Sequence, residues 1–156
     1  MRRLLVLLPL GLAACGACDA SGLAPGAIRA TLNGDAWDGG ETTWGLAGDS
    51  VQILSASTGD WWMSAIVQET DAGALAGDAL GDLPQTFDLS SEAIGGFATF
   101  YPAAGESFST RQASGGTLTL DAQDGDDLLG CFAFTAANAA GDEVVVKSGL
   151  FRAKAR

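Results

Sequence analysis

Turn-forming residues recur at short intervals along this chain and leave room for strands rather than helices between them. Asn33-Gly34 follows the apolar segment 28–32, and Gly and Asp residues punctuate the rest of the chain in a similar way. Asn-Gly is the strongest short-range signal of a β-hairpin, because both residues tolerate the positive φ angles of its tight turn. The segments between the turns lack a helical apolar period. The pattern predicts an all-β fold.

The expected strands are short and regularly separated, as in a single antiparallel sandwich or barrel-like domain. They cover residues 28–32, 42–46, 51–57, 61–68, 86–89, 97–101, 117–120, 128–136 and 143–153. We expect the domain to span residues 27–156, which is enough chain for one hydrophobic core.

Alternation along the last two expected strands predicts which side chains form the core. Phe132 and Phe134 share one face of their strand, and Cys131 lies on the opposite face. Phenylalanine buries a large apolar area, so we expect the Phe face to point inward. In the final strand Phe151 and Arg152 lie on opposite faces, which places the arginine outside.

Residues 1–14 have the composition of a secretory signal peptide. Arg2 and Arg3 precede an uncharged apolar run, and this order of a positive and then a short apolar segment is typical of export signals. The run is well short of the roughly 20 residues that a membrane-spanning helix requires. We therefore expect export without a transmembrane anchor.

The apolar run ends in Leu12-Ala13-Ala14-Cys15, which resembles the lipobox of bacterial lipoproteins. The resemblance implies that Cys15 receives a diacylglyceryl group, becomes the first residue after cleavage, and holds the protein to a membrane through its acyl chains, palmitate among them. A chance cysteine after an ordinary signal peptide is the alternative. Gly16 in place of an aspartate favours the outer membrane in the Gram-negative sorting scheme. Residues 15–26 are expected to form a flexible, lipid-anchored tether.

Charge limits the partners that the exported chain can have. Without residues 1–14, six basic residues face 19 acidic ones, a formal charge of −13. Such a surface repels phosphate backbones and anionic headgroups. We therefore expect no nucleic-acid partner and contact with the membrane through the acyl chains on Cys15.

The absence of histidine limits the chemistry that the chain can perform. Its 156 residues include none, which removes the commonest general base and the usual ligand of catalytic zinc. The sequence also lacks nucleophile-elbow and phosphate-loop motifs. We predict no catalytic residue, metal or cofactor, and expect a protein that is not an enzyme.

Cys18 and Cys131 are the cysteines that the lipobox leaves unassigned. Disulfides persist in the oxidising compartment that an exported protein enters. Pairing would close a loop of more than a hundred residues and hold the domain close to the membrane. A buried, unpaired Cys131 is the alternative, and sequence alone does not decide between them.

An acidic cluster and four tryptophans are further candidate sites. The cluster around Gly125 lacks the glutamate that a calcium-binding EF-hand has at position twelve, so we interpret it as a polar turn in which Gly125 has a positive φ. The cluster comprises Asp121, Asp124, Asp126 and Asp127.

The tryptophans are candidate binding aromatics. Trp61 and Trp62 are adjacent in an expected strand, so their side chains should face opposite ways. The outward one, with Trp37 or Trp44 nearby, would offer a stacking platform to a glycan or a docking point to a protein. Tryptophans that merely cover an edge of the sandwich are the alternative.

Two motifs stand near the ends of the domain. Residues 30–37 read ATLNGDAW, and residues 130–136 read GCFAFTA before Gly149-Leu150-Phe151. Together they resemble an uncharacterised (DUF-type) family of small bacterial β-rich lipoproteins. The resemblance implies export and a β fold, and it implies no particular activity.

The sequence thus predicts an exported, lipid-anchored lipoprotein of the cell envelope that binds a protein or glycan without catalysis. A structural or assembly lipoprotein without a small-molecule site is the second hypothesis, and a hydrolase that uses acidic residues is the third. A pocket lined by tryptophan would favour the first, a filled core with a flat surface the second, and converging buried carboxylates the third.

Overall fold

The computed structural model describes residues 18–47, 50–56, 61–68, 80, 83–90, 96–102 and 106–156, with backbone alone for residues 47, 61–68 and 102. This part of the chain forms eleven strands, and its only helical element is the single turn η1, Thr110–Gln112. The predicted all-β fold is confirmed. The strands are β1 Ala27–Leu32, β2 Asp35–Asp38, β3 Glu41–Ala47, β4 Ser50–Ala56, β5 Trp61–Gln68, β6 Gln85–Asp88, β7 Gly96–Pro102, β8 Phe108–Ser109, β9 Gly115–Asp124, β10 Asp127–Ala137 and β11 Glu143–Ala155.

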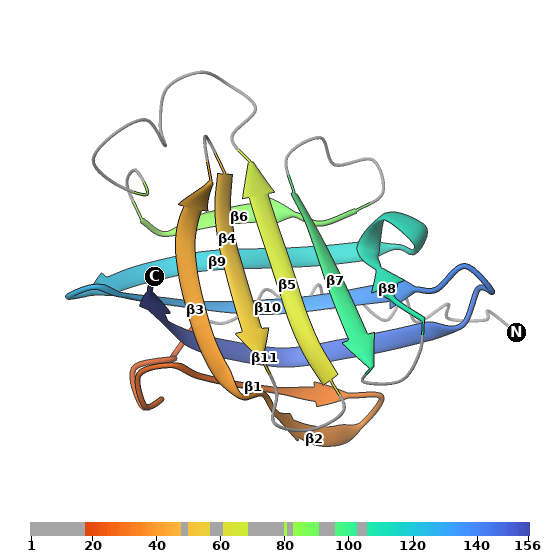
Figure 1. Ribbon diagram of the computed structural model, residues 1–156, viewed down its shortest axis with the longest axis horizontal. Coiled ribbons are helices and arrows are strands. Elements are labelled where there is room, and N and C mark those ends of the chain that lie inside the picture. The colour runs from red at the N-terminus through yellow and green to blue at the C-terminus, as the bar shows by residue number, and fades with distance from the viewer. Residues whose placement is uncertain are drawn as a thin grey trace, which may run out of the picture.

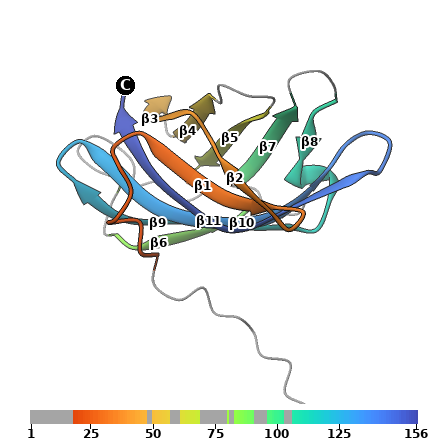
Figure 2. The ribbon, with the colours of Figure 1, turned by 90° about the horizontal axis from the view of Figure 1, so that it is seen from below.

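The strands form two stacked layers. The back layer has the order β2-β1-β11-β10-β9-β6, and the front layer has the order β3-β4-β5-β7-β8. The front strands run across the back strands (Figure 1), and in the view from below the front layer lies above the back layer (Figure 2). Of the two forms that the sequence left open, the structure is therefore the sandwich.

Two short pairings join the layers at their corners. The end of β11 pairs in parallel with β3, at Lys154↔Thr43, and the end of β10 pairs with β8, at Ala137↔Ser109. The turn η1 follows β8, and the buried Thr110 Oγ1 accepts a hydrogen bond from the backbone N–H of Ala98 at 3.0 Å. Corners of this kind are expected where the strands of two packed sheets cross.

The predicted hairpin at Asn33-Gly34 is confirmed. β1 and β2 pair with Leu32 opposite Asp35, and Asn33 and Gly34 have φ angles of 48° and 99°. The Asn33 side chain also accepts a hydrogen bond from the backbone N–H of Val145 at 2.8 Å. The asparagine therefore supplies both the turn conformation and a contact to β11.

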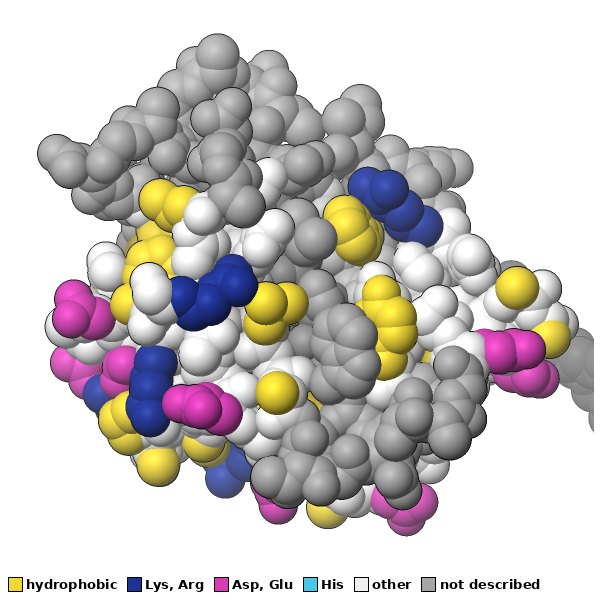
Figure 3. Space-filling view, viewed as in Figure 1, with side chains coloured by type: hydrophobic (Ala, Val, Ile, Leu, Met, Phe, Trp, Pro, Cys, Tyr) yellow, Lys and Arg dark blue, Asp and Glu magenta, His cyan; other side chains and the backbone are white. Residues whose placement is uncertain are grey.

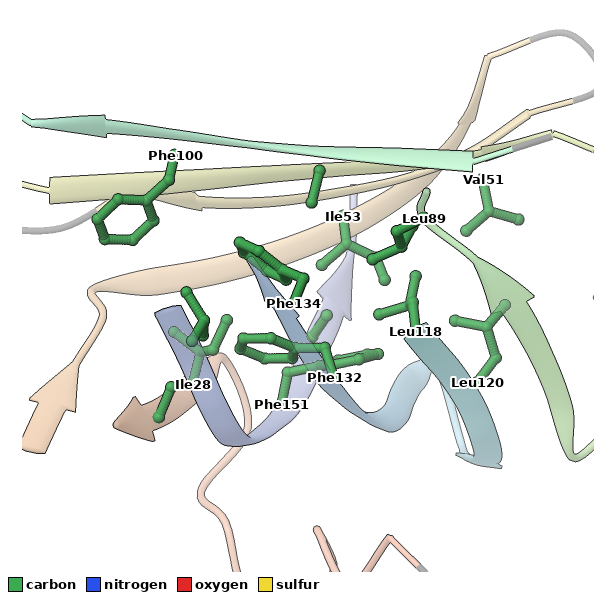
Figure 4. Close-up of a cluster of buried hydrophobic side chains, with 14 of the residues drawn as sticks. Ile28, Val51, Ile53, Leu89, Phe100, Leu118, Leu120, Phe132, Phe134 and Phe151 are labelled. Atoms are coloured by element: carbon green, nitrogen blue, oxygen red, sulfur yellow. The ribbon is translucent and has the colours of Figure 1, made fainter. Parts of the chain in front are cut away.

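The core lies between the layers, and the predicted Phe132/Phe134 face of β10 points into it. The rings of Phe132 and Phe134 stack with their centroids 6.0 Å apart, and the Phe151 ring lies 6.4 Å from that of Phe132. Figure 4 shows these rings beneath side chains from the front layer. Buried core side chains include Ile28, Leu118, Leu120, Leu128, Phe132, Phe134 and Phe151 from the back layer and Val51, Ile53, Ala98 and Phe100 from the front layer.

The Gly-x-Phe motifs of β10 and β11 have a packing explanation. In the antiparallel register Gly130 lies opposite Phe151, and Phe132 lies opposite Gly149. A Cβ added to either glycine would collide with the phenylalanine ring of the partner strand. Each ring therefore covers the glycine opposite to it, a cross-strand arrangement that fixes the register of the pair.

A β-bulge lets both halves of β11 face the core. Phe132 pairs with Gly149 and Phe134 with Val146, so two residues of β11 lie opposite one residue of β10. Ser148 within this bulge has a φ of 51°. The extra residue shifts the alternation by one position, which keeps Val146 and Gly149 on the buried face and leaves Lys147 and Ser148 exposed.

Candidate anchoring site and binding surfaces

A disulfide joins Cys18 to Cys131 on the outer face of the back layer. Their Cα atoms lie 5.4 Å apart, within the usual range for a disulfide, and the bridge spans 113 positions of sequence. Cys131 points away from the core, as alternation predicts, yet it is only 7% exposed, and its outward neighbour Leu129 is 6% exposed. The pairing that the sequence left open is therefore present.

The segment that carries Cys18 folds onto the domain. The flexible tether expected over residues 15–26 does not include residues 18–26, whose Ala20 is 1% exposed. The backbone N–H of Leu23 donates to the Ala20 carbonyl at 3.0 Å, and that of Gly26 donates to the Arg152 carbonyl at 2.7 Å. Figure 2 shows this segment beneath the back layer. The disulfide and these backbone bonds explain why a Gly- and Ala-rich sequence is ordered here.

The predicted lipid attachment site, Cys15, lies outside the described residues, as do the rest of residues 1–17. In the part of the chain that the structure describes, no helix is long and apolar enough to cross a membrane.

The acidic cluster forms a turn and an ion-pair network. Gly125 has a φ of 61° in the β9–β10 turn, as predicted. Arg152 on β11 donates from Nε to Asp127 at 2.7 Å and from its guanidinium to Asp124 at 2.8 Å. The hydrogen bond that Arg152 donates to Asp127 raises the pKa of the Arg152 guanidinium. These carboxylates bind an arginine, and among the described residues no three acidic, cysteine or histidine side chains gather to hold a metal ion.

Trp37 and Trp44 both pack against the core. The Trp37 ring makes an edge-on contact with Phe100, with centroids 5.6 Å apart. Trp44 donates its indole N–H to the Asp126 carbonyl at 2.9 Å and so ties the front layer to the β9–β10 turn. These contacts agree with the alternative of covering tryptophans.

Trp61 and Trp62 lie in β5, opposite Pro102 and Tyr101 of β7. Their side chains lie outside the described part of the structure, so the prediction that they face opposite ways stays a prediction.

A small open pocket lies where the β1–β2 hairpin meets the bulge of β11. Its volume is about 220 Å³, and Arg29, Thr31, Asp38 and Ser148 supply its polar groups. Ligand sites usually measure roughly 300–1,000 Å³. Trp37 is among the lining residues, but its ring packs on Phe100. The pocket is thus small and of mixed polarity rather than an aromatic cleft.

The outer face of the front layer combines apolar and basic side chains. Leu54 on β4 and Phe97 on β7 are half-buried and point away from the core, and the Arg111 guanidinium lies 4.2 Å from the centroid of the Phe97 ring. Arg156 donates to the Gln52 side chain at 3.3 Å on the same face. Figure 3 shows hydrophobic and basic side chains at the centre of the described part of this face, with acidic side chains at its margins.

Leu54, Phe97 and Arg111 were not among the site residues predicted from sequence. Alternation along the expected strands 51–57 and 97–101 could have placed Leu54 and Phe97 on the outer face. The position of Arg111 over Phe97 depends on the η1 turn, which no pattern in the sequence indicates.

No family model matches the chain, and neither does any curated protein or solved structure. The resemblance of the two ends of the domain to small bacterial β-rich lipoproteins therefore stays a prediction.

Proposed function

We propose that this chain is an exported lipoprotein, held to a membrane of the cell envelope by acyl chains on Cys15. The observation that supports the proposal is the Cys18–Cys131 disulfide, which begins three residues after the lipobox cysteine. Structural disulfides persist outside the cytosol, where glutathione and thioredoxin do not keep thiols reduced. The bridge and the export signal are independent features that indicate the same compartment.

Two or more acyl chains supply the membrane affinity. Each buried methylene contributes about 0.8 kcal/mol, and a single chain gives only reversible binding. The acidic surface adds no attraction to anionic lipids, so loss of the acyl chains should release the protein.

Metabolic labelling with a clickable palmitate analogue tests the anchor. We expect the wild-type protein to incorporate the label and the Cys15→Ala variant to lose it, while Cys18→Ala keeps it as the matched control. Equal labelling of the wild type and Cys15→Ala would exclude acylation at Cys15.

The proposal includes binding of a protein or glycan without catalysis, and the outer face of the front layer is the surface that fits this role best. Its half-buried Leu54 and Phe97, with Arg111 over the ring, combine apolar contact area with positive charge on an otherwise acidic domain. Aromatic residues and arginine are enriched where proteins bind each other, so this face favours a protein partner over a glycan.

A structural or assembly role without a specific small-molecule site is the second candidate. The filled core, the small pocket and the packed Trp37 and Trp44 favour it over a small-molecule carrier.

Site-specific photo-crosslinking in intact cells separates the two candidates. A photoreactive residue at Leu54 should give a discrete protein adduct, and one at Thr117 on the back layer should give none. An absence of adducts from Leu54, or the same adducts from both positions, would favour the structural role.

A further inference from the structure

We infer that the Cys18–Cys131 disulfide fixes the orientation of the domain on the membrane. The outer face of the back layer around β9, β10 and β11 faces the bilayer, and the outer face of the front layer points away from it. The inference rests on the proposed acylation of Cys15 and adds to it the face of the protein that the lipid surface meets.

Only a short length of chain separates the anchor from the bridge. Cys15 precedes Cys18 by three residues, which span at most about 11 Å when fully extended. The Cys18 Cα lies 5.4 Å from that of Cys131, which points outward from the back layer. The Cα atom of Cys15 therefore lies within about 11 Å of the Cα atom of Cys18, on the outer side of the back layer.

This reach excludes the inverted orientation. Packed sheets lie about 10 Å apart, so the front layer is separated from Cys18 by that spacing in addition to the 5.4 Å between the two cysteine Cα atoms. The outer side chains of the front layer are farther still. Three residues cannot cover this distance, so the anchor cannot reach a bilayer that lies against the front layer.

The position of β10 in its layer disfavours an edge-on orientation. Two strands, β9 and β6, separate it from one edge, and three, β11, β1 and β2, separate it from the other. At about 4.8 Å per strand, the nearer edge lies about 10 Å away, which would extend the three residues to their limit. The flat orientation, in contrast, requires no such extension of the three residues.

The surface around the bridge suits a layer of lipid headgroups. Thr117 and Thr119 on β9 and Thr86 on β6 present hydroxyl groups there, with the Thr86 and Thr119 Oγ1 atoms 2.9 Å apart. Asp124 and Asp127, which would repel phosphate groups, are paired with Arg152. Asp88 on β6, opposite Thr117, also lies exposed on this face. The face is therefore polar and only partly neutralised, on a chain that is strongly acidic as a whole.

Lysine reactivity can measure the orientation, because the chain has only two lysines, Lys147 and Lys154. Lys147 is exposed in the bulge of β11 and reports on the back layer. An Ala56→Lys substitution places a matched reporter on the front layer, at an exposed position opposite Glu41, where a lysine makes a favourable cross-strand pair.

The experiment compares the acetylation of these two lysines by a water-soluble reagent, read by mass spectrometry. The lipid-bearing Ala56→Lys protein in phosphatidylcholine vesicles is compared with the soluble Cys15→Ala/Ala56→Lys protein. We expect the ratio of Lys147 to front-layer labelling to fall several-fold on the vesicles. An insertion of about twelve Gly and Ser residues after Gly16 keeps the disulfide and lengthens the reach, and it should restore the ratio.

The outcomes distinguish this inference from the proposed anchor. A lipid-bearing Cys15 with an unchanged labelling ratio, or with a ratio that the insertion leaves low, would overturn the orientation alone. An unmodified Cys15 in the same spectra would overturn the anchor and the orientation together.

Discussion

The back and front layers of the sandwich use their outer faces differently. On the back layer, Cys131 is bonded to Cys18, and Leu129 and Cys131 are both buried, so that this part of β10 is buried on both of its faces. On the front layer, Leu54 and Phe97 stay half-exposed beside basic side chains. The two layers share one core. The difference between them is that a disulfide and backbone hydrogen bonds hold an additional segment, residues 18–26, against the back layer.

Removal of the disulfide should have the largest effect on stability, and the structural change should occur in the back layer. In the chain-entropy model a bridge around a loop of this length stabilises the fold by about 4–5 kcal/mol. We expect the Cys18→Ser/Cys131→Ser variant to lose free energy of unfolding of this order in chemical denaturation. An unchanged stability would mean that the covering segment contributes nothing to the back layer.

The loss of an aromatic ring from the core should have the second-largest effect on stability. Phe134→Ala empties a buried site in the back layer and should cost about 3–5 kcal/mol. Leu54→Ala, on the outer face of the front layer, should cost much less because its side chain is only half-buried. Similar losses in the two variants would contradict the assignment of inner and outer faces.

Two glycines, one in each layer, should differ in how their replacement by alanine affects stability. Gly149→Ala places a Cβ against the Phe132 ring in the back layer, and the overpacking should cost about 1–3 kcal/mol. Gly45→Ala in the front layer meets only the flexible end of the Arg156 side chain. It should be neutral or slightly stabilising, since alanine is preferred to glycine within a strand. The difference in denaturation midpoint between the two variants measures the effect.

Much of the back layer could be predicted from sequence, because its long strands alternate and its turns use Asn-Gly and Asp-Gly. The faces of Phe132, Phe134 and Cys131 followed from that alternation. The bulge at Ser148 could not be predicted, because an extra residue is tolerated only in response to the register of both neighbouring strands.

Other features depend on contacts between residues distant in sequence. The ordering of residues 18–26 and the hydrogen bond from Trp44 to Asp126 are of this kind. Candidate sites were harder to predict than strands, since tryptophan has the same sequence signal whether it binds a partner or packs on Phe100.

The smallest effect concerns an inward-facing polar side chain of the front layer. Ser55 is buried, and its hydroxyl has no hydrogen-bond partner within the described part of the chain. Because an unpaired buried hydroxyl is destabilising, Ser55→Ala should leave stability unchanged or raise it by up to about 1 kcal/mol. A clear loss of stability on thermal denaturation would show that this hydroxyl is hydrogen-bonded in solution.

The most direct test of the account is the mass of one tryptic species from the unreduced protein isolated from membranes. Cleavage at Arg29, Arg111 and Lys147 should release residues 15–29 joined by the Cys18–Cys131 bridge to residues 112–147. The account predicts a single disulfide-linked species whose mass includes a diacylglyceryl group on Cys15. Separate peptides with free Cys18 and Cys131, or a linked species without lipid, would contradict it.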